Sequence, residues 1–341
     1  MIDFRYHLVS IVAVFLALAV GIVVGATALK PSALRTLDYQ SRREQQQINS
    51  QRTTISGLQD QLNADRAFAE ANAPRALDNL LAGQRAVLVT APSADATTIS
   101  GVTAALKQAG AQVTGQAELQ PAFFDTSAST QNSLEVLAQQ VAPPGVTVRI
   151  PTAPSAADAQ IVGQQEAAQV LALALVTKNA DLPAQQTKAI LDGFAQQQFL
   201  KMTPASRSAT LSQASLAVVI IPAAPPASGA SNPANLALIS LAEQLRLSSL
   251  GVVVAGNLSG SGSGSVIDEL ISGSTGIQLS TVDDADIEVG QIEVAQALSF
   301  LLAGHKPDAY GVRAKAAPNP APTPTTTPTP TRSPAKTKSH G

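Results

Sequence analysis

The first of three hydrophobic patterns along this chain is a long uninterrupted apolar run. From Leu8 to Leu29 the sequence reads LVSIVAVFLALAVGIVVGATAL and contains no charged side chain. At about 1.5 Å per residue, a helix of this length covers about 30 Å, the thickness of the hydrocarbon core of a bilayer. We therefore predict a transmembrane helix over residues 8–29, preceded by a short cytoplasmic N-terminus of residues 1–7.

The second pattern is a heptad repeat over residues 30–76, which predicts a coiled coil. When Leu34 takes position a, the a and d positions of the repeat hold apolar residues at Leu34, Leu37, Ile48, Ile55, Leu58, Leu62 and Ala69, and polar residues at Ser41, Glu44, Gln51 and Asp65. So narrow a stripe is typical of a coiled-coil seam rather than of a helix packed on a globular core. The polar seam residues weaken self-pairing, and Gly57 costs about 1 kcal/mol relative to Ala.

A weak seam of this kind can exchange its own copy for a partner helix. We therefore expect the coiled coil to be the working surface, with self-pairing into a homodimer as one arrangement. The residues we assign to partner binding are Ile48, Ile55, Leu58 and Leu62 in the seam, with Arg42, Arg43, Arg52 and Arg66 beside it to set partner choice.

The third pattern begins at Gly83, where short apolar runs bounded by turn residues alternate with amphipathic stretches. Strands are expected at 85–90, 112–116, 215–221, 251–255 and 278–282, and helices at 94–109, 130–141, 155–178, 184–199, 233–247, 266–272 and 289–303. Alternation of apolar strands with helices indicates an α/β domain around a parallel, Rossmann-like sheet. We place this domain at residues 83–304. The remainder, 305–341, is rich in Pro and Thr and basic, and it predicts a disordered tail.

Composition narrows the chemistry. The 22 Lys and Arg nearly balance the 24 Asp and Glu, so no nucleic-acid footprint is expected. There is no cysteine, hence no disulfide and no thiolate ligand. The only histidines are His7, His305 and His340, so the α/β domain lacks the commonest general base. We assign no catalytic residue, cofactor or metal ligand, and expect a protein that is not an enzyme.

Two motifs in the domain resemble ligand-binding sites, but we expect both to have a structural role. The Gly/Ser loop at 256–264 follows a strand and precedes a helix, where α/β sheets bind phosphate, but it lacks the G-x-G-x-x-G spacing and reads as a connector. Asp283, Asp284, Asp286 and Glu288 could bind a hard cation. Acidic residues also favour a helix N-terminus, which is the role expected for Asp286 and Glu288.

The membrane segment leaves two alternatives open. Gly21 and Gly25 have the GxxxG spacing that lets two membrane helices approach closely, although ordinary membrane-helix glycines show it too. Residues 26–28, Ala-Thr-Ala, resemble a signal-peptide cleavage site, but the apolar run is longer than the usual signal core of about 7–15 residues. We expect an uncleaved anchor with the body outside the cytoplasm, although nearby Lys and Arg favour the opposite side.

The two ends of the chain resemble a known family. The opening MIDFRYHLVS, the run VFLALAVGIVVG over residues 14–25, and LSTVDDAD over 279–286 with Gly290 and Gln291 are similar to an actinobacterial envelope family usually named for the mycobacterial copper transport protein MctB. The resemblance implies a body outside the plasma membrane. It implies one of two roles: copper homeostasis, or cell separation as in the SteB relatives, which act with SteA to recruit and activate a peptidoglycan hydrolase.

The physics of the sequence favours the second role. One apolar span cannot line a pore, and the alternating strands of a membrane barrel are missing. A polar, weakly seamed helix beside a membrane is a suitable docking site for another helix. Our main hypothesis is therefore a non-enzymatic, membrane-anchored scaffold of cell-wall remodelling. Copper efflux is the alternative, and small-ligand binding by the 256–264 loop is a third.

Overall fold

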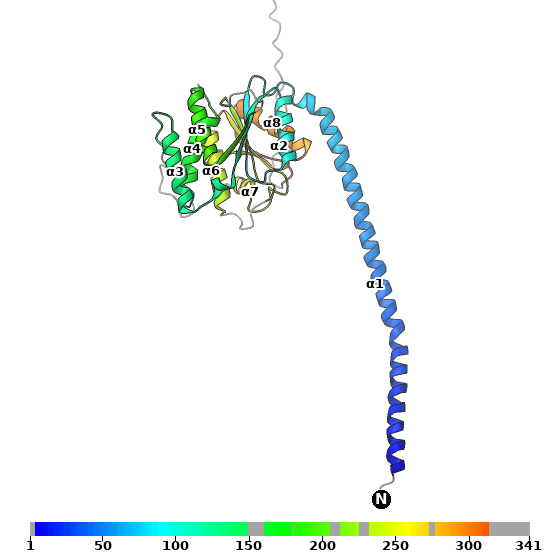
Figure 1. The fold of residues 1–341 in the computed structure, drawn as a ribbon. Helices are drawn as coiled ribbons and strands as arrows, with labels where there is room; N and C mark the ends of the chain where they lie inside the picture. Colours follow the sequence, from blue (N-terminus) through cyan, green and yellow to red (C-terminus); the bar gives the residue numbers. More distant parts are fainter. Residues whose placement is uncertain are drawn as a thin grey trace, which may run out of the picture. The chain divides into compact units, whose positions relative to one another are not determined.

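The computed structural model describes residues 4–148, 160–179, 181–204, 212–224, 232–272 and 277–313, and for residues 4, 5 and 26–38 it describes the backbone alone. By its internal contacts the chain divides into two units, Met1–Ala67 and Phe68–Gly341. The first unit consists of most of one long helix, and the second is the body (Figure 1).

Helix α1 (Phe4–Ala76) is continuous over 73 residues. It therefore contains both the predicted membrane span and the predicted coiled-coil helix, without an interruption between them. The sequence places the end of this helix near Pro74, two residues before its observed end. Within the described residues, the segment Tyr6–Gly25 is the only helix long and apolar enough to cross a membrane. Its side chains are exposed to solvent in the isolated chain, as the lipid-facing surface of an anchor requires.

The body is a mixed α/β domain, which confirms the predicted fold class. Its strands are β1 (Arg85–Thr90), β2 (Gln112–Leu119), β3 (Leu200–Pro204), β4 (Leu216–Ile220), β5 (Gly251–Ala255), β6 (Ser280–Val282) and β7 (Ala309–Tyr310). They form one seven-stranded sheet in the order β3-β2-β1-β4-β5-β6-β7. All neighbouring strands are parallel except β2 and β3.

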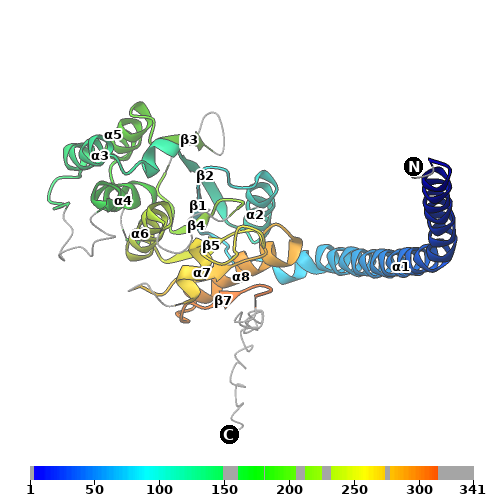
Figure 2. The ribbon, with the colours of Figure 1, turned by 90° about the horizontal axis from the view of Figure 1, so that it is seen from below.

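Helices cover both faces of the sheet (Figures 1 and 2). They are α2 (Ala96–Gln108), the 3-10 helix η1 (Pro121–Phe124), α3 (Ala128–Val141), α4 (Val162–Leu175), α5 (Ala184–Gln196), α6 (Pro233–Ser248), α7 (Val266–Ile271) and α8 (Glu288–Leu302). One core layer lies between the sheet and α3 to α6, and the other between the sheet and α2 and α8. Strand β4 contributes side chains to both core layers, since Val219 lies in the first and Val218 in the second.

The end of α1 belongs to the body rather than to a free coiled coil. Ala69, a predicted seam residue, is only 6% exposed, and Leu77 and Leu81, just beyond the helix, are buried in the α2 and α8 layer. The chain then turns at Gly83, whose φ of 76° is left-handed backbone that favours glycine, and enters β1.

Two strands were not expected from the sequence. Strand β3 (LKMTP) is an exposed, antiparallel edge strand, and β7 pairs two residues beside β6 within the segment assigned to the tail. Residues 309–313, which the sequence analysis assigned to the disordered tail, are therefore part of the body, and the remainder of the predicted tail from residue 314 lies outside the described residues. The predicted helix at 155–178 is observed as α4, and its first part, 155–159, also lies outside them.

Candidate functional site

A line of large apolar side chains lies exposed on α1, within the first unit. Ile48 is 42% exposed, Ile55 54%, Leu58 56% and Leu62 54%. Their spacing of three, four and seven residues puts them on one side of the helix. Four aliphatic side chains that are each about half exposed along one line constitute a surface that a partner would bury. We call these four residues the stalk seam.

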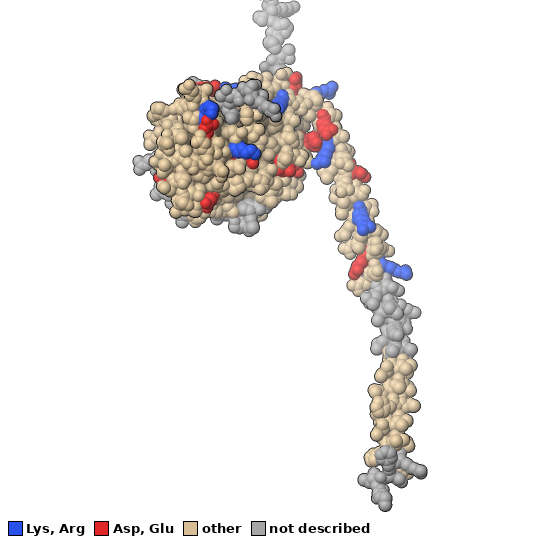
Figure 3. All heavy atoms as spheres, viewed as in Figure 1, with Lys and Arg blue, Asp and Glu red and all other residues tan. Residues whose placement is uncertain are grey.

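Polar side chains on the same helix are satisfied within it. The Gln40 amide donates to Glu44 Oε1 at 3.3 Å, and the Gln45 amide to Asn49 Oδ1 at 3.3 Å. Arg43 stacks over the Tyr39 ring, 5.3 Å from its centroid. The surface shows basic and acidic side chains alternating along this part of α1, whereas the described part of the membrane segment shows neither (Figure 3). Such i,i+4 pairing supports a solvent-exposed helix.

The arginines assigned to partner choice, Arg42, Arg43, Arg52 and Arg66, are all exposed along the same helix. Their part in recognition stays a prediction. Leu34 and Leu37, the first two seam residues of the heptad repeat, lie where the side chains are not described. The observed stalk seam is therefore the part of the predicted seam from Ile48 to Leu62.

Gly21 and Gly25 present an open face on the membrane segment, since a Cβ added to either would meet no atom within 4 Å. At 100° per residue in an ideal helix, Gly21 lies about 160° and Gly25 about 120° around the axis from Ile55. The glycine face and the stalk seam are thus on different sides of one continuous helix.

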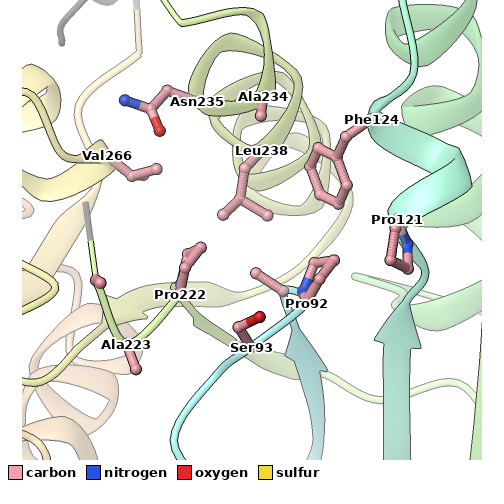
Figure 4. A pocket seen from close by; sticks show the side chains of 12 residues that line it. Pro92, Ser93, Pro121, Phe124, Pro222, Ala223, Ala234, Asn235, Leu238 and Val266 are labelled. Carbon is pink, nitrogen blue, oxygen red and sulfur yellow. The ribbon is translucent and has the colours of Figure 1, made fainter. Parts of the chain in front are cut away.

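The body contains an apolar cavity of about 470 Å³ at the carboxyl ends of β1 and β4 (Figure 4). The described residues that line it are Ala91, Pro92, Ser93, Pro121, Phe124, Pro222, Ala223, Ala224, Ala234, Asn235, Leu238 and Val266. Strand order reverses between β1 and β4. The chain leaves β1 through α2 on one face of the sheet to reach β2, and it leaves β4 through α6 on the other face to reach β5. Crevices at such a switch point are where open α/β sheets bind ligands.

The 256–264 loop is not among the described residues that line this cavity. Two of its hydrogen bonds lie within the loop: the Gly260 N–H donates to Asn257 Oδ1 at 2.7 Å, and Ser261 Oγ to the Asn257 carbonyl at 2.8 Å. A Cβ at Gly260 would lie 2.3 Å from the Pro222 carbonyl oxygen, so the loop is packed against the residues after β4. This geometry fits a close-packed connector rather than a phosphate cradle.

Sequence reasoning missed the cavity because its location depends on strand order. The residues after β1 and β4 are Ala91-Pro92-Ser93 and Pro222-Ala223-Ala224, neither of which carries a recognised motif. The available signal was an apolar strand with proline at the second position after its end, a pattern that occurs at both β1 and β4. This signal indicates a shared cavity only when β1 and β4 are known to be neighbouring strands.

The acidic residues after β6 are built into the fold. Asp283 is 1% exposed, and its two carboxylate oxygens accept the backbone N–H groups of Val312 at 2.9 Å and Arg313 at 3.2 Å. Asp283 therefore fastens the segment that follows β7. Arg313 also donates to Asp268 Oδ1 at 3.1 Å.

Two carboxyl groups beside it have strongly raised pKa values. Burial, with the charges of Asp283 and Asp286 adding to it, raises the pKa of Asp284 to about 6. Burial, followed by repulsion from Asp284 and Asp283, raises the pKa of Glu293 to about 8. Asp284 Oδ1 and Glu293 Oε2 accept no hydrogen bond from the described residues. Across those residues, no three His, Cys, Asp or Glu side chains are arranged to hold a metal ion.

Together these features define a class of protein: an α/β body whose chain begins with one long helix, apolar enough at its start to cross a membrane and carrying an exposed seam further on. The chain belongs to the family described as copper transport outer membrane protein, MctB, whose model matches residues 1–320. The resemblance seen at the two ends of the sequence is confirmed.

Curated relatives match along nearly the whole length. The proteins named copper transporter MctB from Mycobacterium tuberculosis and Mycobacterium bovis are 28% identical over 318 residues, covering 91% of this chain and 96% of theirs. The protein of the same name from Mycobacterium leprae is 28% identical over 319 residues, covering 92% of this chain and 96% of its own. The similarity therefore includes the long helix as well as the body.

Proposed function

We propose that this chain is a non-enzymatic scaffold anchored in the plasma membrane by α1, with its body in the cell envelope, that acts by docking a partner helix on the stalk seam. The observation that carries the proposal is the exposure of Ile48, Ile55, Leu58 and Leu62 on one side of a helix. Burying a side chain of this size contributes about 1.5–3 kcal/mol, so the seam holds a substantial reserve of binding free energy.

The proposed process is cell-wall remodelling and cell separation. In this scheme the seam recruits a SteA-like partner and a peptidoglycan hydrolase, as the SteB relatives do, and the arginines beside the seam select the partner by charge. An anchored stalk suits such a role, because it restricts an activator to the membrane surface without needing a reaction centre of its own. Homodimerisation through the seam is the competing use of the same surface.

The test is a paired substitution on the full chain expressed in its native host. Replacing Ile55 and Leu58 by Asp puts two charges into the seam and should abolish copurification of the partner and cause a separation defect. The matched control, Thr53→Asp with Ser56→Asp, adds the same charges on the outward side of the same two turns. Equal behaviour of the two double variants would reject the seam as the working surface.

Copper transport is the second candidate, favoured by the printed names of the family and of the mycobacterial relatives. Under this alternative copper is cargo, and the chain is one component of an efflux path. A deletion strain that accumulates copper, separates normally and recovers when the chain is restored would favour it. A separation defect at normal copper content would favour the scaffold.

A further inference from the structure

The apolar cavity at the carboxyl ends of β1 and β4 has the composition of a ligand site for an uncharged molecule. Phe124, Leu238 and Val266 point into it from three different elements (Figure 4). Pro92, Pro121 and Pro222 line it as well, and proline has no backbone N–H to offer. No Lys, Arg, Asp or Glu occurs among the described residues that line the cavity. A volume of about 470 Å³ lies within the range of small-molecule pockets.

The usual ligand of this position, a nucleotide, does not fit. Nucleotide binding at a switch point uses a glycine-rich turn after the first strand and the free N-terminus of the next helix. Here the turn holds Pro92 and Ser93, and the N-terminus of α2 is occupied by the Asp95 carboxylate, which accepts the Thr98 N–H at 2.8 Å. A negative charge already fills the place where a phosphate would bind.

Two described lining residues have polar side chains, Ser93 and Asn235, and Asn235 supplies an oriented acceptor. Its side chain is 4% exposed, and its amide nitrogen donates to the Gly264 carbonyl at 2.8 Å and to Glu269 Oε1 at 3.0 Å. Because both partners are acceptors, they fix which end of the amide is nitrogen. The amide oxygen then faces the other way, toward the Val266 side of the cavity (Figure 4). An oxygen in that position accepts a hydrogen bond from a ligand.

We infer that this cavity binds an uncharged lipid alcohol, with its hydroxyl donating to Asn235 Oδ1 and its hydrocarbon part against Phe124, Leu238 and Val266. The lining favours an apolar body, the amide oxygen accepts a hydrogen bond from one donor, and the described lining residues offer no charged side chain to pair with an ionised head group. With α1 anchored in the membrane as proposed above, neutral membrane amphiphiles are the molecules of this chemistry that the chain meets. This inference rests on the anchor of the proposed function and does not depend on the stalk seam.

The test uses the full chain in phosphatidylcholine nanodiscs and photolabelling with a diazirine-bearing decanol. Three control probes have the same alkyl chain and diazirine, but a sulfate, a trimethylammonium or a methyl ether replaces the hydroxyl group. Mass spectrometry of the digested protein should place the decanol label on residues 91–93, 222–224 or 234–238. The two charged probes should label these residues about tenfold less, and the ether a few-fold less because it has no donor.

Ala223→Trp fills the cavity from a half-buried loop position and should remove this labelling. Ala122→Trp, on an exposed residue of η1 that does not line the cavity, should leave it unchanged. Labelling spread evenly over the body, or equal for all four head groups, would overturn the inference. The position of the label and its dependence on the head group are both measured on the unaltered protein, so they decide the question even if a variant fails to fold.

Discussion

Gly290 lies directly against the backbone of Asp284: a Cβ added at Gly290 would be 2.2 Å from the Asp284 carbonyl oxygen. The next residue, Gln291, lies over Gly101 of α2, where an added Cβ would meet its amide at 2.2 Å. Gly290 and Gln291, which are part of the resemblance to the family, therefore have a packing role. It holds the start of α8 against the loop after β6 and against α2.

This contact predicts the sign of a helix substitution. Helix propensity alone makes Gly→Ala favourable by about 1 kcal/mol. Gly290→Ala should instead destabilise the body by about 1–3 kcal/mol, because the clash is with backbone that cannot move aside. Gly101→Ala should cost less, since the Gln291 amide is the end of a flexible side chain. Chemical denaturation of the full chain measures both, and a Gly290→Ala protein that is more stable than the parent would contradict the packing described.

Gly57 provides the opposite case on the stalk. A Cβ there would meet nothing within 4 Å, so Gly57→Ala should stabilise this part of α1 by about 1 kcal/mol. Hydrogen exchange should slow at the amides of residues 53–61 and stay unchanged in the body. Faster exchange in this segment would indicate that the position needs glycine for a reason other than helix geometry.

The buried carboxyl groups predict how stability depends on pH. Glu293 has a folded pKa of about 8 against an ordinary value of 4.5, so the folded state binds more protons between these values. Its contribution is fully present below about pH 4.5 and is lost as pH rises through 8. The body should therefore unfold at a lower temperature at pH 8.5 than at pH 5.5.

Glu293→Gln removes this titration while keeping the shape of the side chain. The variant should melt about a few degrees above the parent at pH 8.5 and show a smaller change between the two pH values. Glu288→Gln, a neighbouring residue for which burial is only partial, serves as the matched control. Equal pH dependence of the parent and the Glu293→Gln protein would show that Glu293 is not the titrating group.

The hydrogen bonds from Val312 and Arg313 to Asp283, here called the Asp283 clamp, predict that substitution of Asp283 has a local rather than a global effect on stability. Asp283→Asn keeps the size of the side chain but replaces one acceptor oxygen by an NH₂ group, so one of the two backbone donors loses its acceptor. At least one of the amides of Val312 and Arg313 should exchange faster by the equivalent of about 1–3 kcal/mol, while those of β4 and β5 remain protected. Unchanged exchange at both amides would mean that the clamp is not needed to hold this segment.

Sequence patterns predicted the elements that rest on local signals. The buried strands β1, β4 and β5 are runs of Val, Ile, Leu and Ala, and they lie within one residue of their expected bounds. Helix α2 ends within one residue of its expected end, just before Gly110, whose φ of 88° is left-handed backbone. Strand β3 could not be predicted, because the alternation in LKMTP is short and its pairing with β2 is set by the tertiary fold.

The sites divide in the same way. The stalk seam is a property of one helix, so heptad spacing alone locates Ile48, Ile55, Leu58 and Leu62. The cavity brings together the residues after β1, β2 and β4 with α6 and α7, which only the strand order makes neighbours. The acidic residues after β6 resembled a cation site in sequence, and only the folded chain reveals that Asp283 binds the backbone of residues 312 and 313.

The claim that the stalk seam is the working surface is tested most directly by site-specific photocrosslinking in living cells. A photoreactive amino acid replaces Ile55 in the seam of the full chain, and in a second strain it replaces Thr53 on the outward side of the helix. We predict a discrete adduct with one partner protein, or with a second copy of this chain, from position 55 and none from position 53. The same adducts from both positions, or none from either, would contradict the account.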